Sequence, residues 1–506
     1  MPFVNKIFQL FFNRRLKQIG EISIHPLEIQ QAQFEMLVNK AKDTVWGKKF
    51  DFKSINSISD FQSRLPIQKY EEMYPNIELI RKGGKDILWP GQINWFARSS
   101  GTTNDKSKFI PITNESLRKC HYRGGVDALA LYIRNNPKSK ILTGKSLTLG
   151  GSHQIDYFDK KARSGDLSAI MLQNLPFWYD IIRTPPKKIA LISQWEEKLE
   201  KFTKYTIKEN VTAFAGVPSW NLVMIKHILE VTGKNNLLEI WPNLELFMHG
   251  GVNFAPYREQ YKRLIPNPNM HYMETYNASE GFFAIQDEPG DPSMLLMLDY
   301  GIFYEFIPMD QYYNGSTKAI PLSEVETGVN YAMAISTNGG LWRYIIGDTI
   351  IFNSVMPYKI MITGRTKHFI NAFGEELIID NAEKALEVAC QATGALINEY
   401  TAAPVYMDQN LKGKHEWLIE FDKEPIDQEK FNDIFDKTLI TLNSDYEAKR
   451  YKNITLDPPI IRCVAKGSFY RWFSKKGKLG GQNKIPRLSN DRKYVDEMLK
   501  IMEVIA

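Results

Sequence analysis

Apolar positions along the chain follow two different periods. A continuous apolar run at residues 211–217 predicts a buried strand, and from Pro218 to Gly233 apolar side chains recur every three or four residues, which predicts a helix. Further strands are expected at residues 244–248 and 271–275. Strands that alternate with amphipathic helices are typical of an α/β protein.

Polar, glycine-rich segments follow two of these strands. His249 precedes Gly250 and Gly251 after the second strand, and a loop is expected at residues 276–281 after the third. Folds of the α/β class bind their ligands at loops just past strand ends. Both loops are therefore candidate ligand-binding segments.

The pattern changes between residues 294 and 352, where short alternating segments are separated by glycine and asparagine turns. This pattern predicts antiparallel hairpins and a small barrel. We place a domain boundary near Gly364. The expected division is a large N-terminal domain of residues 1–363 and a small C-terminal domain of residues 364–506, with a hinge near residues 364–370.

Helices and strands also alternate in the C-terminal part. A helix is expected at residues 380–393, where Asp380 has the position of a cap and Gly394 that of a stop. A strand at residues 416–421 and a helix around residues 431–442 follow. The small domain is thus expected to be of the α+β class.

The N-terminal segment is apolar at residues 3–12, but Lys6 interrupts it and Arg14 and Arg15 follow it. It is too short to cross a bilayer and no small-residue cleavage site comes next. We expect an amphipathic helix packed on the domain, with contact to a membrane surface as the alternative. No run of about 20 apolar residues predicts a membrane span elsewhere.

Composition narrows the class of protein further. The 506 residues are 43% hydrophobic and 24% charged, which predicts a globular chain of at least two domains. The net charge of +6 is small and no long run of one sign occurs, so nucleic acid is not an expected partner. Three scattered cysteines predict neither a disulfide framework nor a zinc site, and a cytoplasmic location is expected.

Residues 99–108 form a hydroxyl-rich turn between two apolar runs, and this turn is the most informative segment of the chain. Small residues allow close approach of a polyphosphate, hydroxyl and N–H groups donate to its oxygens, and lysines offset its charge. An ordinary solvated turn has a similar composition. Other catalytic patterns are missing, because no G-x-S-x-G or H-E-x-x-H segment occurs and the Walker-like segment at 143–146 has Ser139 where glycine is needed.

Two acidic residues are candidates for nucleotide binding. Glu280 follows Ser279 in a strand-end loop, where one carboxylate could hold Mg²⁺ between phosphates. Asp348 could accept both hydroxyls of a ribose. The alternatives are a helix cap or solvated turn for Glu280 and an ordinary hairpin for Asp348.

Five segments together resemble the adenylate-forming superfamily and, more narrowly, the Gretchen Hagen family of acyl acid amido synthetases. In chain order they are Ser-Ser-Gly-Thr at 99–102, Tyr-Asn-Ala-Ser-Glu at 276–280, Gly-Leu-Trp-Arg-Tyr-Ile-Ile-Gly-Asp at 340–348, Gly-Arg-Thr-Lys at 364–367 and Gly-Gln-Asn-Lys-Ile-Pro-Arg at 481–487. The resemblance implies a large domain with mixed α/β layers and a small β-barrel, and a smaller mobile α+β domain.

The resemblance also implies a reaction in two steps. A small carboxylic acid attacks the α-phosphate of ATP to give an acyl adenylate and pyrophosphate, and an amine, usually of an amino acid, then displaces AMP. Charge on the transferring phosphate calls for positioned donors and cations, with ATP and Mg²⁺ as cofactors. We expect a monomer.

The resemblance implies roles for individual residues of this sequence. Lys484 would reach the bridging oxygens in the first step, Glu280 would hold Mg²⁺, Ser279 would lie near the carboxylate or the α-phosphate, and Lys367 would sit at the hinge. The residues expected to bind ATP or AMP are Ser99, Ser100, Gly101, Thr102, Thr103, Lys108, Gly250, Gly251, Tyr276, Asp348 and Arg365. Tyr276 would flank the adenine, and Asp348 and Arg365 would bind the ribose.

The chain departs from the family pattern in two places. Asn104 and Asp105 stand where glycine or serine is usual, and a carboxylate there repels phosphate unless it points away or helps the metal. Ile345 stands where the plant enzymes often carry arginine. The acyl pocket is expected between the helix after the phosphate loop and the loops near 150–152, 217–218 and 249–251; its candidate aromatic residues are Phe96, Trp178, Phe214 and Trp220.

Two alternative functions remain open at this point. An acyl-CoA ligase shares the first step but uses a thiol acceptor. The chain has no obvious basic track for the phosphates of coenzyme A, although Lys475, Lys476 and Lys478 keep this alternative open. A non-catalytic binder of nucleotide or acyl ligand is the second alternative, with Asn104 and Asp105 as signs of a decayed loop.

Overall fold

The computed structural model divides the chain into two compact units. It describes residues 2–99, 108–149, 156–157, 162–175, 179–192, 194–251, 254–366, 369–370, 372, 375, 377–405, 413–443, 446–447, 450, 456–476, 485–489 and 492–501. The first unit comprises Met1–Gly216, Leu238–Gly251 and Pro268–Ile362. The second comprises Val217–Leu237, Val252–Asn267 and Thr363–Ala506.

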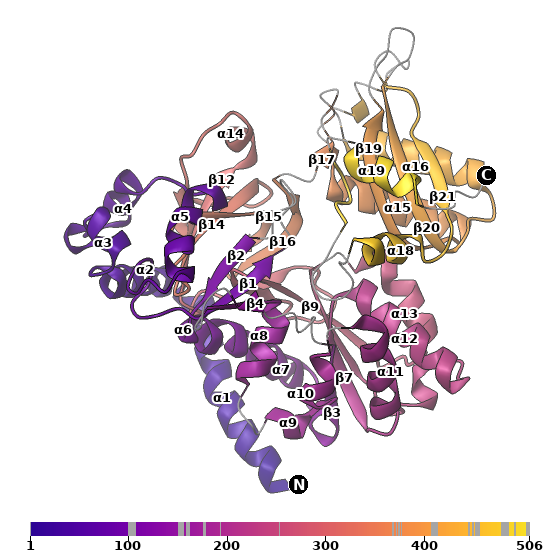
Figure 1. The fold of residues 1–506 in the computed structure, drawn as a ribbon, viewed down its shortest axis with the longest axis horizontal. Helices are drawn as coiled ribbons and strands as arrows, with labels where there is room; N and C mark the ends of the chain where they lie inside the picture. The colour runs from indigo at the N-terminus through magenta and orange to yellow at the C-terminus, as the bar shows by residue number, and fades with distance from the viewer. Residues whose placement is uncertain are drawn as a thin grey trace. The chain divides into compact units, whose positions relative to one another are not determined.

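Helices surround the sheets of the first unit (Figure 1). They are α1 Pro2–Ile24, α2 Pro26–Ala41, α3 Val45–Lys49, η1 Phe52–Ser54, α4 Ile58–Arg64, α5 Tyr70–Arg81, α6 Asn114–Ser116, the π-helical turn η2 Leu117–His121, α7 Tyr122–Asn135, η3 Ile141–Thr143, α8 Leu167–Asn174, α9 Tyr179–Ile182, α10 Lys187–Ala190, α11 Trp195–Thr206, η4 Leu237–Glu239, α14 Met309–Tyr313 and η6 Leu322–Glu324. Caps begin several of them. Thr44 accepts from the N–H of Gly47, and Ser57 accepts from that of Asp60.

The second half of the N-terminal helix α1 packs on the first unit. Ile19 and Ile22 are buried in the core. The Arg15 guanidinium donates from Nη2 to Asp127 of α7 at 2.7 Å and from Nη1 to Asp299 at 2.7 Å. Tyr300 also donates to Asp127, at 2.6 Å, so a buried ion-pair network joins α1, α7 and the segment before β12.

A twelve-stranded sheet forms the centre of the first unit. Its order is β13 Ile320–Pro321, β12 Ile302–Pro308, β14 Asn330–Thr337, β15 Tyr344–Val355, β16 Tyr358–Arg365, β11 Met294–Leu296, β10 Gly281–Ile285, β9 His271–Ala278, β8 Leu246–His249, β7 Val211–Gly216, β3 Lys145–Thr148 and β6 Arg183–Thr184. The strands from β9 to β6 are parallel. The pairings β9–β10, β10–β11, β11–β16, β14–β15, β12–β14 and β12–β13 are antiparallel, as the alternating pattern predicts.

Several predicted helix and strand boundaries agree with the structure, and others differ from it. Strand β7 starts at Val211, and α12 (Pro218–Thr232) ends at Gly233 with a φ of 65°, as expected. Strand β8 begins at Leu246 rather than Leu244. Strand β9 continues through Ala278, because its pairing with β10 holds in strand form the residues that the sequence predicts as a loop.

A smaller sheet supports the predicted phosphate loop. Its order is β2 Lys108–Ile112, β1 Trp95–Ser99, β5 Arg163–Gly165 and β4 Asp156–Tyr157. Strands β1 and β2 are antiparallel, and Ser99 pairs with Lys108. The eight residues between them lie outside the described part of the chain.

The second unit has a three-stranded sheet covered by helices. The sheet order is β19 Leu396–Val405, β20 Lys414–Lys423 and β21 Ile460–Val464, and a short pair is formed by β17 Phe369–Ile370 and β18 Leu377–Ile378. Its helices are α12, η5 Ala255–Tyr257, α13 Arg258–Leu264, α15 Ile379–Thr393, α16 Gln428–Leu442, α18 Ser468–Lys475 and α19 Lys493–Leu499. The prediction of Asp380 as a cap is wrong, because α15 already begins at Ile379 and Asp380 lies in its first turn. Gly394 ends this helix as expected, with a φ of 69°.

Candidate functional site

The base of the predicted phosphate loop is fixed by strand pairing and by an aromatic side chain. Tyr70 Oη accepts from the N–H of Phe109 at 2.8 Å, next to Lys108. Burial, which outweighs this hydrogen bond, raises the pKa of Tyr70 to about 12. Lys108 Nζ lies 5.6 Å from the centre of the Tyr70 ring. Lys108 therefore stands at the mouth of the loop with its ammonium against an aromatic face.

The glycine pair after β8 allows two strands to approach closely. A Cβ on Gly250 would lie 2.3 Å from the carbonyl oxygen of Thr275 in β9, so a larger residue there would push the strand ends apart. Gly251 has a φ of 81°, which favours glycine. Thr275 Oγ1 donates to the carbonyl of His249 at 3.3 Å and closes this junction.

Tyr276 and Asp348, two predicted nucleotide-binding residues from different segments, are brought together. Tyr276 Oη donates to Asp348 Oδ2 at 2.8 Å, and both side chains are buried. Their strands β9 and β15 are separated by β10, β11 and β16 in the sheet order. In a flat sheet that separation would be about 19 Å, so this part of the sheet curls strongly. The described strands form an open order, and the curl brings the ends of β9 and β15 toward each other.

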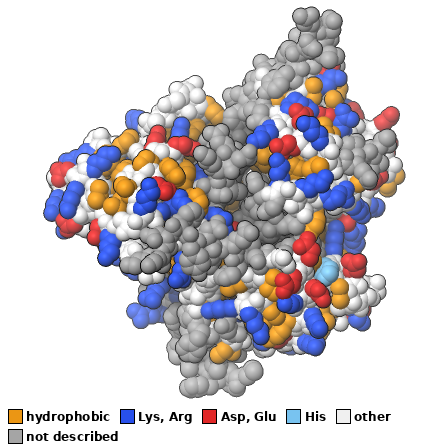
Figure 2. All heavy atoms as spheres, in the orientation of Figure 1, with side chains coloured by type: hydrophobic (Ala, Val, Ile, Leu, Met, Phe, Trp, Pro, Cys, Tyr) orange, Lys and Arg blue, Asp and Glu red, His pale blue; other side chains and the backbone are white. Residues whose placement is uncertain are grey.

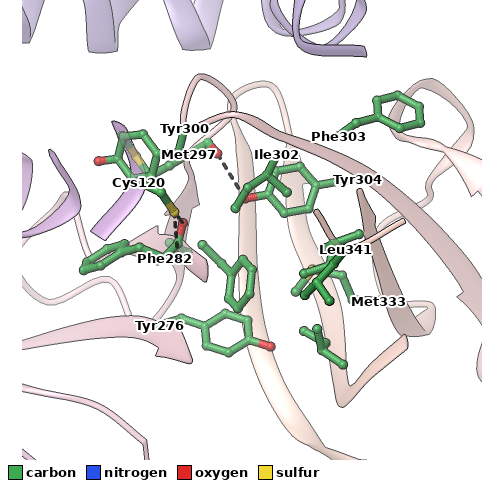
Figure 3. Packing of buried hydrophobic residues seen from close by; sticks show 14 of the residues in the cluster. Cys120, Tyr276, Phe282, Met297, Tyr300, Ile302, Phe303, Tyr304, Met333 and Leu341 are labelled. Atoms are coloured by element: carbon green, nitrogen blue, oxygen red, sulfur yellow. Dashed lines mark hydrogen bonds between the residues drawn. The ribbon is translucent and has the colours of Figure 1, made fainter. Parts of the chain in front are cut away.

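The ring of Tyr276 belongs to the apolar core below this contact. It lies 4.8 Å from the ring of Phe283, measured between centroids. Figure 3 shows it at the border of a cluster that also contains Phe282, Tyr300 and Tyr304. Cys120 of the π-helical turn lies in the same cluster and accepts from the N–H of Phe282 at 3.1 Å. Core packing thus fixes the ring, and the hydroxyl is left to hold Asp348.

Asp348 lies inside a strand rather than in the hairpin turn that is the alternative from sequence. Gly347 before it has a φ of 90°, and the pairing of β14 with β15 shifts register at this point. Such an irregularity turns a side chain away from the regular alternation. The bulge therefore directs Asp348 toward β9.

Ser279 and Glu280 form the two-residue turn between β9 and β10. The Ser279 hydroxyl is buried and has no hydrogen-bond partner within the described part of the chain. Glu280 is half-buried and interacts with the protein. A buried hydroxyl without a partner is costly, and such groups are frequent where a ligand completes the hydrogen bond.

The segment 340–348 is anchored by a buried ion pair that sequence reasoning missed. Arg343 donates from Nε to Glu305 Oε2 at 2.9 Å and from Nη2 to Oε1 at 2.9 Å, and Glu305 is fully buried. Arg343 also donates to the carbonyls of Gln62 and Leu65. Its φ of 45° turns the backbone into β15, so this pair fixes the start of the strand that carries Asp348.

For other predicted site residues the structure describes the backbone alone or nothing. Ser100, Gly101, Thr102, Thr103, Lys367 and Lys484 lie outside the described residues, as do Asn104 and Asp105. Ser99 ends β1 and Arg365 ends β16, and only their backbones are described. Arg365, Lys367 and Lys484 fall within the second unit.

The candidate acyl-pocket aromatic residues that can be placed are core residues. Phe96 and Phe214 are fully buried, and Phe214 stacks on Phe247 with ring centroids 4.3 Å apart. Trp178 and residues 150–152 lie outside the described part, and of Trp220 only the backbone is described. Ile345, the departure from the plant pattern, packs in a buried apolar cluster with Ile67 and Ile307, where an arginine would be poorly accommodated.

His121, at the end of the π-helical turn, is a buried polar residue that the sequence did not single out. It is 2% exposed, and neither ring nitrogen has a hydrogen-bond partner among the described residues. Burial lowers the pKa of this imidazole to about 4. In the sequence alone, its apolar neighbours Leu117 and Cys120 on the same turn did not indicate that His121 is buried without a hydrogen-bond partner among the described residues.

Comparison with known families decides the relationship. The GH3 family N-terminal domain matches residues 15–270, the central domain matches residues 295–365 and the C-terminal domain matches residues 380–493. The chain belongs to the GH3 family. The matched ranges contain the segments at 99–102, 340–348 and 481–487 from which the sequence resemblance was drawn, and the predicted family is confirmed.

Curated GH3 relatives cover nearly the whole chain. The indole-3-acetic acid-amido synthetase GH3.4 of Arabidopsis thaliana is 24% identical over 558 residues, which cover 94% of this chain and 91% of the relative. GH3.3 of the same plant, with the same description, is 22% identical over 553 residues and 94% and 91% of the two chains. These matches confirm the predicted ligase class and support ATP-dependent acyl adenylation followed by amide formation.

Solved structures confirm the predicted fold class. The GH3.15 acyl acid amido synthetase superposes with a TM-score of 0.80 at 17% identity, over 97% of this chain and 96% of that chain. A 2-hydroxyisobutyryl-CoA ligase in the postadenylation state has a TM-score of 0.62 at 12% identity, over 93% and 90%. This GH3 chain therefore has the adenylate-forming fold, with a large N-terminal and a smaller C-terminal part.

The described residues of this GH3 chain were also compared with the patterns of charged surfaces, membrane-spanning helices and metal sites. On the face shown in Figure 2, lysine and arginine side chains lie interspersed with acidic ones. Within the described ranges, no helix is long and apolar enough to cross a membrane. The same residues contain no group of three or more His, Cys, Asp or Glu side chains arranged for a metal ion.

Proposed function

We propose that this GH3 protein joins an aromatic or medium-length apolar carboxylic acid to an amino acid through an acyl adenylate. The observation that carries the proposal is the Tyr276–Asp348 hydrogen bond. It unites two family segments that are 72 residues apart in one buried polar contact. Relatives named indole-3-acetic acid-amido synthetases, and a GH3.15 structure in complex with 2,4-DB, support the choice of acid class.

In this proposal the residues of the first unit bind ATP. Asp348 accepts from the ribose hydroxyls, and the Tyr276 hydroxyl holds that carboxylate in one orientation. The loop that begins at Ser99 and ends at Lys108 surrounds the phosphates with backbone N–H and hydroxyl donors. Ser279 donates its buried hydroxyl to the acid carboxylate or to the α-phosphate.

The chemistry needs little from the protein besides position and charge. The acid carboxylate oxygen attacks the α-phosphorus, the bond to the bridging oxygen breaks, and pyrophosphate leaves with the electron pair. Lys484 from the small domain would stabilise negative charge on the bridging oxygens. In the second step the amine attacks the acyl carbon, loses a proton, and AMP leaves.

Magnesium is the expected metal, and Glu280 is its expected protein ligand. A single half-buried carboxylate in a turn, next to the buried Ser279 hydroxyl, fits a metal that keeps several waters and binds mainly through substrate phosphates. Bound there, Mg²⁺ would neutralise phosphate charge. All three cysteines are free, which suits a reaction in the reducing cytoplasm.

The test is carboxylate-dependent exchange of labelled pyrophosphate into ATP with Mg²⁺, over a panel of aromatic and aliphatic acids. Exchange with one class of acid is the expected result. The active acid is then supplied with either the twenty amino acids or coenzyme A, and amide rather than thioester is expected. Thioester would establish the acyl-CoA ligase instead, and absence of exchange with ATP binding confirmed would favour a non-catalytic binder.

A further inference from the structure

A buried charge cluster in the second unit lies beside the segment that follows Lys484. Arg487 is 8% exposed and donates from Nη1 to Glu383 of α15 and from Nη2 to Tyr257 Oη at 2.9 Å. Glu399 lies 3.5 Å from the same Nη2, and the Tyr400 ring centre lies 5.0 Å from the guanidinium carbon. Two carboxylates, a phenol and an aromatic face therefore surround one cation.

The surroundings keep the Arg487 side chain charged. Burial acts to lower the pKa of its guanidinium, but Tyr257, Glu383, Glu399 and Tyr400 raise that pKa well above its ordinary value. Removing the cation would leave the buried Glu383 carboxylate and the partly buried Glu399 carboxylate without their cation. The pocket is thus built for arginine, whose flat, forked head satisfies several acceptors at once.

The backbone around Arg487 is held as firmly as its side chain. The N–H of Ala402 in β19 donates to the carbonyl of Arg487 at 2.8 Å, and the N–H of Ser489 donates to the carbonyl of Ala402 at 3.0 Å. Thr401 Oγ1 donates to the carbonyl of Pro486 at 2.6 Å. Residues 485–489 therefore run beside β19, joined to it by an isolated parallel bridge between Leu488 and Ala402, with Arg487 as the inward anchor of this segment.

We propose that Arg487 is a positioning residue for the adenylation step: its bonds to Glu383 and Tyr257 fix the segment 485–489 and thereby set the place of Lys484. This inference rests on the proposed function, in which Lys484 acts on the phosphates. Lys484 is three residues before Arg487, so the covalent backbone transmits a shift of the anchor to it. Arg487 itself touches no substrate in this proposal.

The test compares Arg487→Lys with a matched control, Arg450→Lys. Arg450 belongs to the same unit, is also 8% exposed, and pairs with Asp436 and the carbonyl of Leu456. Both variants lose a buried arginine, but only the first lies on the segment next to Lys484. We expect Arg487→Lys to lower the rate of pyrophosphate exchange about 100-fold at an unchanged KM for the acid, because a displacement of about 1 Å has that effect. Arg450→Lys should lower thermal stability and leave the exchange rate per folded molecule within about twofold.

A double-mutant cycle separates positioning from general stability. Residual exchange is measured for Lys484→Ala and for Lys484→Ala combined with Arg487→Lys. If Arg487 acts through Lys484, the second change has no further effect in the Lys484→Ala background. A further loss of about 100-fold in that background would overturn the positioning role.

A milder variant keeps the test open if Arg487→Lys fails to fold. Tyr257→Phe removes one acceptor from Arg487 and should lower exchange about tenfold, with faster hydrogen exchange at the amides of residues 485–489. Unchanged exchange and protection in Tyr257→Phe would overturn the inference.

The experiment also distinguishes this inference from the proposed function. Unaltered exchange in Lys484→Ala, or no exchange by the wild-type protein, would overturn both. Loss of exchange in Lys484→Ala while Arg487→Lys behaves like Arg450→Lys would overturn the inference alone.

Discussion

The Tyr276 hydroxyl donates a hydrogen bond to Asp348 at 2.8 Å, although three strands lie between β9 and β15 in the sheet order. The contact exists because the sheet curls and because the bulge at Gly347 turns Asp348 toward β9. A carboxylate held by a buried phenol has fewer orientations available before a ligand arrives. In the proposed function, less freedom would then be lost when the ribose of ATP binds.

Tyr276→Phe should therefore weaken ATP binding without disrupting the core. The ring keeps its packing against Phe283, but Asp348 loses a donor to a charged acceptor, a bond worth about 1.5–3 kcal/mol. We expect the KM for ATP to rise at least about tenfold in the pyrophosphate exchange assay. Tyr304→Phe is the control, because its hydroxyl donates to the carbonyl of Met297 in the same core and not to a site residue. An equal KM in Tyr276→Phe and wild type would contradict the assignment of Asp348.

Ser279→Ala should separate function from stability. No partner within the described residues loses a hydrogen bond, so the free energy of unfolding should stay within about 0.5 kcal/mol of wild type, while the exchange rate falls about tenfold or more. Ser116→Ala is the matched control, because this buried hydroxyl accepts from the N–H of Thr113 and donates to its carbonyl. It should cost about 1 kcal/mol of stability and spare activity. A destabilised Ser279→Ala protein with normal exchange would rule out the ligand-binding role.

Glu305→Gln should destabilise the first unit strongly. The change leaves the buried Arg343 guanidinium without its counter-charge, and breaking a buried pair in this way costs about 3–5 kcal/mol. Chemical denaturation followed by tryptophan fluorescence measures the effect. Glu197→Gln, which removes an exposed pair with Lys201, should change stability by less than about 1 kcal/mol. Similar losses in the two variants would show that the Arg343 pair contributes little.

His121 should make the protein less stable in mild acid. Its pKa is about 4 in the folded chain against an ordinary value of 6.5, so between these values the unfolded chain binds more protons and stability falls as pH falls. The loss from this residue approaches about 3 kcal/mol near pH 4. His121→Leu should remove that part of the slope, measured by thermal unfolding from pH 4 to pH 7. The exposed His25→Gln is the control, and an unchanged slope in His121→Leu would exclude the buried imidazole as the cause.

Lys367→Pro tests the predicted hinge. Fixing φ at this position should block the change of backbone dihedrals that a rotation of the small domain requires, so one half-reaction should be impaired more than the other. Pyrophosphate exchange measures the first half-reaction, and release of AMP from synthetic acyl adenylate by an amino acid measures the second. Equal losses in both would count against a hinge at Lys367.

Local features of the chain were predictable because they depend on neighbouring residues. The pattern of apolar residues predicted β7 and α12. Gly233 and Gly394 end helices because those positions have positive φ. The segments around Ser99, Tyr276 and Asp348 carried the family resemblance for the same reason, since each is contiguous in sequence. The error at Asp380 is also local, because helix α15 starts one residue earlier than its side-chain pattern suggests.

The sequence by itself determined the order of helices and strands, the motifs and, through them, the family. Only the tertiary structure decided which of those motifs meet. Tyr276 reaches Asp348, Arg343 reaches Glu305 and Arg487 reaches Glu383 over separations of 72, 38 and 104 residues. Such contacts depend on the curl of a sheet and on the exclusion of water from a buried pair, and both arise only when distant segments pack together.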